Sequence, residues 1–535
     1  MVIRATSVND AQLQFIDSAS CKRWIESLPL TNLQAAHSAL SEQVALVRHA
    51  NVAPAELLRL LEILREPVEY VQSGLAQKYT GKALPLDPSE QTLWLRVVSL
   101  WHEMTDAYLA CRDAHVRGDP ALRNQGALIV MRCLRCTAQS MFEYYRIYRQ
   151  VPARYWKTLH ELYVFAEQSD FAHTTVEGAA LPDEVSSTCC AAYCSALLAE
   201  LANPFALSAR QMGFLTRWIE KWANQVNLSL RPLPPSAIPA LSVDLAGNTG
   251  PRFAEEFEPA STLRQLDLEQ LGRTLRQNIT LLKQGHTPAM LGLGEDARQP
   301  GCENLLMLFY IQWCRAGTGR GEPRNLIEEK AQVCIGMHAA HFFISGRSFR
   351  VPGAALTRAE EHDMQLFGHV SERTERALAS IGSAAVESWE LINQSNSGFM
   401  CMLRQPDAEM RISHNQLMAV RRGTSKLFYL GVVQWLRIEE KPNLFVGVRL
   451  FPGVARAVVA RPANFHGPSG VNGFERAMLL PEMPVPATPA TLILPTGWYQ
   501  PGRFVELFGE QRQVAKLLNV IEKGSDFDRC TVSLV

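Results

Sequence analysis

The sequence predicts an α+β multidomain protein in which an N-terminal array of antiparallel helices precedes a C-terminal β-barrel domain. At 535 residues the chain is too long for one hydrophobic core. Over residues 1–228 apolar residues recur every three or four positions, as on one face of a helix. From about Glu387 the apolar period becomes two, which indicates strands.

The helical part, 1–228, reads as a series of helices with short connections. One apolar stripe comprises Leu33, Ala36, Leu40, Val44 and Val47. Asp87-Pro-Ser-Glu90 is typical of a helix start, because Asp caps free amides, Pro suits the first turn and Glu closes a capping box. Further helices are expected over 120–148, 153–168, 183–202 and 208–226. Short connections favour antiparallel neighbours.

One helix carries a repeat-like pattern. Trp156-Lys-Thr-Leu-His-Glu-Leu-Tyr163 resembles the first helix of a tetratricopeptide repeat, although His160 stands where Gly is usual. No clear second copy follows about 34 residues away, the period of that repeat. A tetratricopeptide-like array of hairpins and an irregular helical bundle therefore both remain open.

The middle of the chain is predicted to be a linker with one short strand, 229–262, followed by a second helical region, 263–385. Pro-rich Arg231–Pro235 and Asn248–Pro251 interrupt the helical pattern on either side of a strand-like Leu241–Leu245. Helices are expected around Asn304–Cys314, Leu326–Phe343 and Leu356–Phe367. Gly317–Gly321 is glycine-rich but lacks the Gly-Lys-Ser/Thr ending of a phosphate loop, which favours a flexible loop.

The C-terminal part is predicted to form a β-barrel, 386–465, with a β-rich extension, 466–535, packed on it. Strands are expected at 387–393, 398–404, 426–438, 443–451 and 455–461. In the extension, strands are expected at Thr491–Leu494, Phe504–Leu507, Ala515–Ile521 and Cys530–Val535.

Composition excludes several classes. With 53 basic and 53 acidic residues the formal net charge is zero, so no overall attraction to nucleic acid or anionic membrane is expected. The N-terminus lacks the pattern of a signal peptide, and no apolar run is long enough to span a bilayer. Twelve scattered cysteines do not resemble a disulfide framework. We expect a reducing, cytoplasmic compartment.

The candidate site is a polar corner, Asn393-Gln-Ser-Asn-Ser-Gly398, which precedes the strand-like runs Leu430–Trp435 and Phe445–Phe451. Asn393 and Ser395 would offer donors and acceptors to a polar ligand. Gly398 would permit a left-handed turn and a close backbone approach.

These three landmarks resemble the PilZ domain, a small bacterial β-barrel with an Asp/Asn-x-Ser-x-x-Gly motif. More broadly, the chain is similar to bacterial proteins that join a long helical N-terminal half to a PilZ-like domain. The resemblance implies a non-enzymatic signalling receiver or adaptor that binds cyclic di-GMP and needs no cofactor or metal. It also implies an Arg-x3-Arg pair just upstream of the barrel, for which Arg373-Thr-Glu-Arg376 lies nearest but has two intervening residues. The predicted ligand-binding residues are Arg373, Arg376, Asn393, Ser395 and Gly398.

Two alternatives remain open. The barrel could be a protein-interaction scaffold that binds no nucleotide, with Asn393 and Ser395 only completing a turn. It could also bind nucleic acid, since small barrels bind single strands through aromatic stacking and basic grooves. Residues 401–460 carry nine basic and four acidic residues, a local balance of +5, which could serve a dianionic ligand or could equally be a solvated face. A protein partner is expected through the helical half. No residue arrangement indicates an enzyme.

Two cysteine-containing segments have metal-like spacing. Cys133 and Cys136 could combine with Cys189, Cys190 and Cys194, and Cys334-x3-His338-x2-His341 could place three ligands on one helical face. Both segments lie within apolar helical patterns, where cysteine usually behaves as a small buried hydrophobe. Ordinary helix packing is therefore the favoured interpretation.

Overall fold

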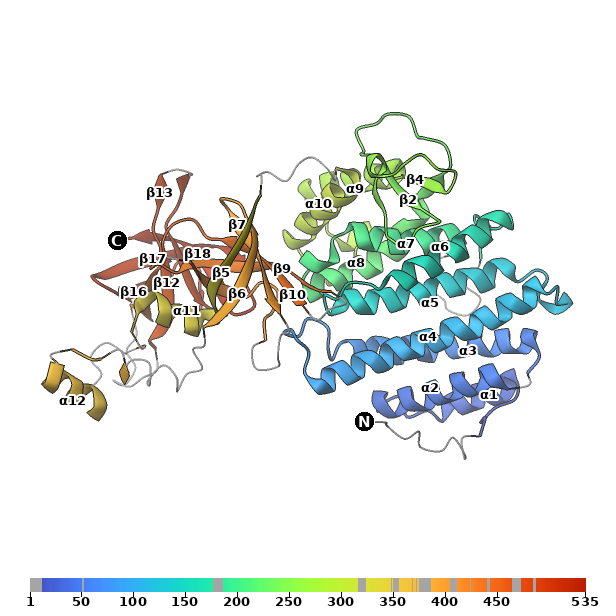
Figure 1. The fold of residues 1–535 in the computed structure, drawn as a ribbon, viewed down its shortest axis with the longest axis horizontal. Helices are drawn as coiled ribbons and strands as arrows, with labels where there is room; N and C mark the ends of the chain where they lie inside the picture. Colours follow the sequence, from blue (N-terminus) through green and yellow to red (C-terminus); the bar gives the residue numbers. More distant parts are fainter. Residues whose placement is uncertain are drawn as a thin grey trace. The chain divides into compact units, whose positions relative to one another are not determined.

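The computed structural model describes residues 12–50, 52–176, 186–315, 324–347, 349, 356–367, 369–371, 373–374, 386–404, 411–423, 425–439, 443–463, 473–484 and 487–535. Contacts divide the chain into two units, of which unit 1 comprises residues 1–82 and 86–320, and unit 2 comprises residues 83–85 and 321–535. Within the described residues, no helix is both long and apolar enough to cross a membrane. The predicted order, helices followed by a β-barrel part, is confirmed, although this part forms two closed barrels where one was expected (Figure 1).

The first part of unit 1 is helical. Its α-helices are α1 (Ser18–Glu26), α2 (Leu33–His49), α3 (Pro54–Ala76), α4 (Pro88–Val116), α5 (Gly126–Arg146), α6 (Ala153–Gln168), α7 (Cys189–Leu201) and α8 (Ala209–Trp222). Neighbours in sequence pack together from α2 to α7 and again as α7 and α8. The predicted start of α4 is confirmed, because the Asp87 carboxylate accepts from the Ser89 and Glu90 amides, both at 2.8 Å.

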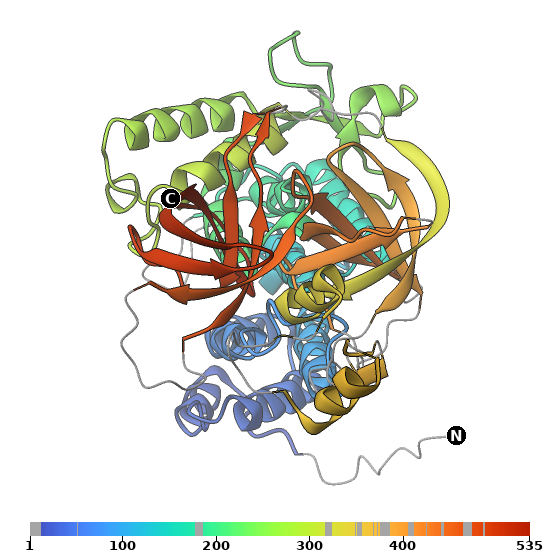
Figure 2. The same cartoon turned by 90° about the vertical axis from the view of Figure 1, so that its left-hand side faces the viewer.

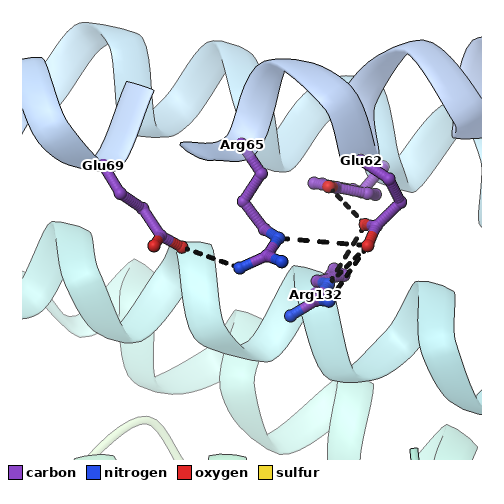
Figure 3. A network of polar contacts seen from close by, with 5 residues as sticks. Glu62, Arg65, Glu69 and Arg132 are labelled. Carbon is purple, nitrogen blue, oxygen red and sulfur yellow. Dashed lines mark hydrogen bonds and ion pairs between the residues drawn. The ribbon is translucent and has the colours of Figure 1, made fainter. Parts of the chain in front are cut away.

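A buried ion pair joins α3 and α5. Arg132 of α5 donates from Nη2 to Oε2 of Glu62 of α3 at 2.9 Å, and its Nε contacts both carboxylate oxygens (Figure 3). The Tyr108 hydroxyl of α4 donates to Glu62 Oε1 at 2.7 Å. Arg132 is only 1% exposed, and the Glu62 carboxylate supplies a counter-charge to its buried guanidinium group.

The repeat-like helix α6 uses its unusual histidine as a packing group. His160 is fully buried, with Nδ1 2.7 Å from the Tyr193 hydroxyl and Nε2 3.1 Å from the Thr249 carbonyl oxygen. Burial lowers the His160 pKa. The side chain therefore links α6 to α7 through Tyr193 and to the segment that contains Thr249. Glycine at this position would make neither contact.

The predicted linker is part of unit 1. A four-stranded sheet has the order β1 (Asn227–Ser229), β4 (Leu263–Asp267), β2 (Leu241–Asp244) and β3 (Arg252–Phe253). The expected strand at Leu241–Leu245 is confirmed as β2, and its Leu241 and Val243 join the helical core. Helices α9 (Glu269–Lys283) and α10 (Gly301–Cys314) pack together after this sheet. The strands are short and pair non-locally, so their sequences show no clear period.

The first closed barrel of unit 2 has the strand order β10-β7-β6-β5-β8-β9. The strands are β5 (Asn325–Ile335), β6 (Glu387–Gln394), β7 (Gly398–Arg404), β8 (Leu417–Arg422), β9 (Tyr429–Ile438) and β10 (Asn443–Leu450). Helices α11 (Gly336–Ser345) and α12 (Arg358–Phe367) lie between β5 and β6 in the sequence. The prediction of a helix over Leu326–Phe343 is thus wrong for its first half, because Asn325–Ile335 pairs with β6 and β8.

The second closed barrel has the order β11-β12-β15-β18-β17-β16 and can be followed in red in Figure 2. Its strands are β11 (Arg456–Pro462), β12 (Glu475–Leu480), β15 (Thr491–Pro495), β16 (Phe504–Phe508), β17 (Arg512–Lys523) and β18 (Phe527–Leu534); β13 (Met483–Pro484) and β14 (Ala487–Thr488) form a separate hairpin. The strand expected at 455–461 therefore belongs to this barrel. The predicted extension, 466–535, supplies the rest of a barrel with its own core.

The two barrels also share buried side chains within unit 2. Phe451, which follows β10, packs edge-on against Phe527 of β18, with ring centroids 6.0 Å apart. The Asp526 carboxylate accepts from the Leu417 amide of β8 at 2.9 Å. Burial raises the Asp526 pKa. Residues from both barrels form one apolar cluster around these contacts.

Candidate functional site

The polar corner Asn393–Gly398 connects β6 to β7 in the first barrel. The Ser395 amide donates to the Gly398 carbonyl at 2.8 Å, and the Leu450 amide at the end of β10 donates to the Ser397 carbonyl at 2.9 Å. These backbone hydrogen bonds hold the corner closed. The Ser395 hydroxyl has only weak contacts, at 3.4 Å to Ser397 Oγ and to the Gly398 carbonyl, and so can bind a ligand at little cost.

Gly398 is required by close packing of the backbone. A Cβ atom at this position would lie 2.2 Å from the Val448 carbonyl oxygen of the neighbouring strand β10. The expected left-handed conformation is wrong, because Gly398 is absent from the positive-φ glycines of the chain. The expected close approach is present, but the group that approaches is strand β10.

One row of residues crosses five strands on the outer face of the barrel beside the corner. Successive Cα pairs follow the order Trp435, Gly447, Met400, Asn393 and Leu326. The row faces outward because Val446 and Val448, on either side of Gly447, are buried. Trp435 covers Gly447, where a Cβ would meet its Nε1 at 1.9 Å. Leu326 is 86% exposed, so the row ends in an accessible apolar group.

Arginines lie at both ends of the corner. Arg324 precedes β5, whose first residue, Asn325, pairs with Gln394, so Arg324 lies beside the corner. Its Nη1 donates to Asn393 Oδ1 at 3.1 Å. On the other side, Arg449 is the Cα partner of Gly398 in the β7–β10 ladder. Two guanidinium groups therefore flank a surface that carries the Ser395 hydroxyl and the Asn393 side-chain amide.

Arg324 also reveals a motif that the sequence-based prediction missed. Because the barrel begins at β5, the segment just upstream is Arg320-Gly-Glu-Pro-Arg324, which has Arg-x3-Arg spacing. The predicted loop Gly317–Gly321 contains Arg320, and both lie outside the described residues. The spacing is visible in the sequence, but with a barrel expected to start near 386 the nearest upstream arginine pair was Arg373-Thr-Glu-Arg376.

Arg373 and Arg376 do not precede the barrel. They fall between its first two strands, β5 and β6, in the same insertion as α12. Arg373 is exposed, and Arg376 lies outside the described residues. The pair was predicted because it was expected to lie upstream of the first strand of the barrel. The strand order contradicts that position. Ligand binding by Arg373 and Arg376 stays a prediction.

The predicted basic surplus over 401–460 is partly compensated by the rest of unit 2. Three of the nine basic residues pair with carboxylates outside this segment, Arg404 with Glu390, Arg422 with Glu329 and Arg449 with Glu522, while Arg437 pairs with Glu439 inside it. Arg324, in contrast, makes no ion pair within the described part of the chain.

The metal-like segments form no cluster in the described ranges. There, no group of three or more His, Cys, Asp or Glu side chains is placed to hold a metal ion. All twelve cysteines are buried free thiols. Cys334 donates to the Ala419 carbonyl, and His341 contacts the Val458 carbonyl at 3.1 Å, so these two residues face different neighbours.

Comparisons with known proteins match both ends of the chain. Residues 19–235 match the family model described as "Cyclic-di-GMP receptor FimW, N-terminal domain", and residues 459–535 match the "FimW C-terminal beta-barrel domain". A curated relative, the cyclic-di-GMP receptor FimW of Pseudomonas aeruginosa, is 21% identical over 563 aligned positions, which cover 96% of this chain and 90% of the relative. The first barrel lies between the two segments matched by the models. From its helical unit to its second barrel, this chain is similar to the cyclic-di-GMP receptor FimW.

Proposed function

We propose that the protein is a non-enzymatic receptor for cyclic di-GMP and that the first barrel, as a PilZ-like domain, binds the nucleotide on the face around Asn393–Gly398. The observation that carries the proposal is the hydrogen bond between Arg324 and Asn393. It joins the end of an Arg-x3-Arg segment to the start of an Asn-x-Ser-x-x-Gly segment, about seventy residues later in the chain. Similarity to a cyclic-di-GMP receptor over nearly the whole chain supports the same ligand.

The chemistry of the face suits a dianionic dinucleotide. A guanidinium group such as that of Arg324 forks onto a phosphate and can also stack on a base. The Ser395 hydroxyl and the Asn393 amide can hydrogen-bond phosphate oxygens or a guanine edge. The exposed Leu326 and the partly exposed Trp435 provide apolar surface for the bases. Because Gly447 has no side chain, the surface between Leu326 and Trp435 stays flat.

We further propose that unit 1 presents a surface for a protein partner. Its helical array has a groove of about 410 Å³ between α3, α4, α5, α7 and α8. Five arginines and three glutamates line this groove, which gives it mixed polar character. The buried free thiols favour action in the reducing cytoplasm.

Calorimetric titration of the full chain with cyclic di-GMP tests the proposal, with linear diguanylate as the control ligand. We expect saturable binding of the cyclic nucleotide. Ser395→Ala should weaken binding by about 1–3 kcal/mol, the usual cost of losing a polar partner. Absence of heat from folded protein at high micromolar nucleotide would favour a scaffold that binds no nucleotide. Steeply salt-dependent binding of an oligonucleotide would favour the nucleic-acid alternative.

A further inference from the structure

Arg449 occupies a position shared by the corner and the second barrel. Its Cα pairs with Gly398, and the amide of the next residue, Leu450, binds the Ser397 carbonyl. Like Gly447, Arg449 points away from the barrel core, since the intervening Val448 is buried. Its side chain is 38% exposed, so a ligand at the corner can reach it.

The partner of Arg449 belongs to the second barrel. Arg449 Nη2 hydrogen-bonds Oε1 of Glu522 on β17. The other carboxylate oxygen of Glu522 lies 3.8 Å from Nη1 of Arg529 on β18. Both guanidinium groups lie over the Phe451 ring, with centroid distances of 5.4 Å for Arg449 and 4.5 Å for Arg529. Glu522 thus stands between an accessible arginine and a buried one.

Arg529 can hold Glu522 when Arg449 leaves. Arg529 is 7% exposed, and its Nε donates to Thr491 Oγ1 at 3.1 Å. This hydrogen bond fixes Arg529 within the second barrel. Arg449 has no equivalent anchor beyond Glu522 and the Phe451 ring among the described residues. Of the two arginines, Arg449 is therefore the one that a competing anion can withdraw from Glu522.

We propose that Arg449 binds a phosphate of the nucleotide and, in doing so, gives up Glu522, so that ligand binding at the corner changes the contact between the two barrels. The inference rests on the proposed function of the corner and adds to it a residue and a means of regulation. A phosphate and Glu522 compete for one guanidinium. Affinity for the nucleotide and the Arg449–Glu522 contact are then reciprocally coupled.

The experiment measures cyclic di-GMP affinity of the full chain for Arg449→Ala, Glu522→Gln and the double variant. Glu522→Gln removes the competing charge but keeps the side-chain shape, so affinity should rise about fivefold or more. Arg449→Ala should lower affinity about tenfold. In the Arg449→Ala background, Glu522→Gln should change nothing. Glu506→Gln, which removes a carboxylate paired with Arg461 and Arg512 in the same barrel, is the matched control and should leave affinity unchanged.

A second readout follows the contact itself. Nucleotide should alter amide hydrogen exchange at the end of β17 in the wild type but not in Glu522→Gln. If Arg449→Ala and Glu522→Gln both bind with wild-type affinity while Arg324→Ala binds weakly, the inference is overturned and the proposed function stands. If folded wild type and every variant fail to bind, both are overturned. Arg449→Lys keeps the charge and shows whether the alanine variant fails only through misfolding.

Discussion

Arg324 and Asn393 meet at 3.1 Å, through a hydrogen bond from the guanidinium Nη1 to the side-chain carbonyl Oδ1. The two residues come from the start of β5 and the end of β6, which the register of the barrel brings side by side. The contact holds the arginine at the corner without neutralising it, because an amide carries no charge. The guanidinium group keeps donors for an anionic ligand.

Arg324→Ala should reduce the affinity for cyclic di-GMP by about 1.5–3 kcal/mol, because a charge-assisted hydrogen bond to phosphate would be lost. Calorimetric titration measures the change. Arg373→Ala is the matched control, since it removes the same charge from an exposed site in the insertion between β5 and β6. A larger loss in Arg373→Ala than in Arg324→Ala would move the site to that insertion.

Gly398→Ala should destabilise the first barrel by about 1–3 kcal/mol, because its Cβ would overlap the Val448 carbonyl oxygen. Hydrogen exchange of the β7 and β10 amides localises the effect. Gly213→Ala is the control, since nothing lies within 4 Å of a Cβ at that position in α8. That substitution should stabilise the helix by about 0.5–1 kcal/mol. Unchanged protection of β7 and β10 in Gly398→Ala would show that the strands do not approach as described.

Glu62→Gln should destabilise unit 1 by about 3–5 kcal/mol, because it removes a carboxylate that pairs with the buried guanidinium of Arg132. Urea unfolding monitored by helical circular dichroism provides the measurement. Asp106→Asn breaks the exposed pair with Arg48 and should cost at most about 1 kcal/mol. Equal effects of the two substitutions would contradict the burial of Arg132.

His341 should make unit 2 sensitive to acid. Burial, reinforced by Arg476 and His338, lowers its pKa from 6.5 to about 4. A depressed histidine pKa contributes stability above the unfolded value of 6.5, and this stability is lost as pH falls from 6.5 towards 4. The full loss is about 3 kcal/mol. His341→Gln, which can still donate to the Val458 carbonyl, should flatten the dependence of unfolding free energy on pH in this range. An identical pH dependence in the variant would rule out this role.

The helical half was readable from the sequence because its signals are local. The capping box at Asp87 and the apolar stripe from Leu33 to Val47 lie within single helices, and both were placed correctly. In the sheet around segment 229–262, only the strand at Leu241–Leu245 was predicted, because the other strands are short and β1 pairs with β4 far along the chain.

The sequence predicted a β-barrel fold but not which strands form each of the two barrels. Strand β5 pairs with β6 across an insertion that contains α11 and α12, so the first strand of the barrel was separated from the others. Likewise, Val459 of β11 pairs with Phe508 of β16, a non-local contact that assigns β11 to the second barrel. The error at β5 also hid Arg320 and Arg324, while Asn393, Ser395 and Gly398 were identified because their motif is contiguous.

A crystal structure of the full chain with cyclic di-GMP tests the proposed nucleotide site most directly. Nucleotide density is expected on the outer face of the first barrel, with a phosphate or guanine in contact with the Arg324 guanidinium and with Asn393 or Ser395. Nucleotide bound in the groove of unit 1, or bound through Arg373 and Arg376 without contact to the Asn393–Gly398 corner, would contradict it.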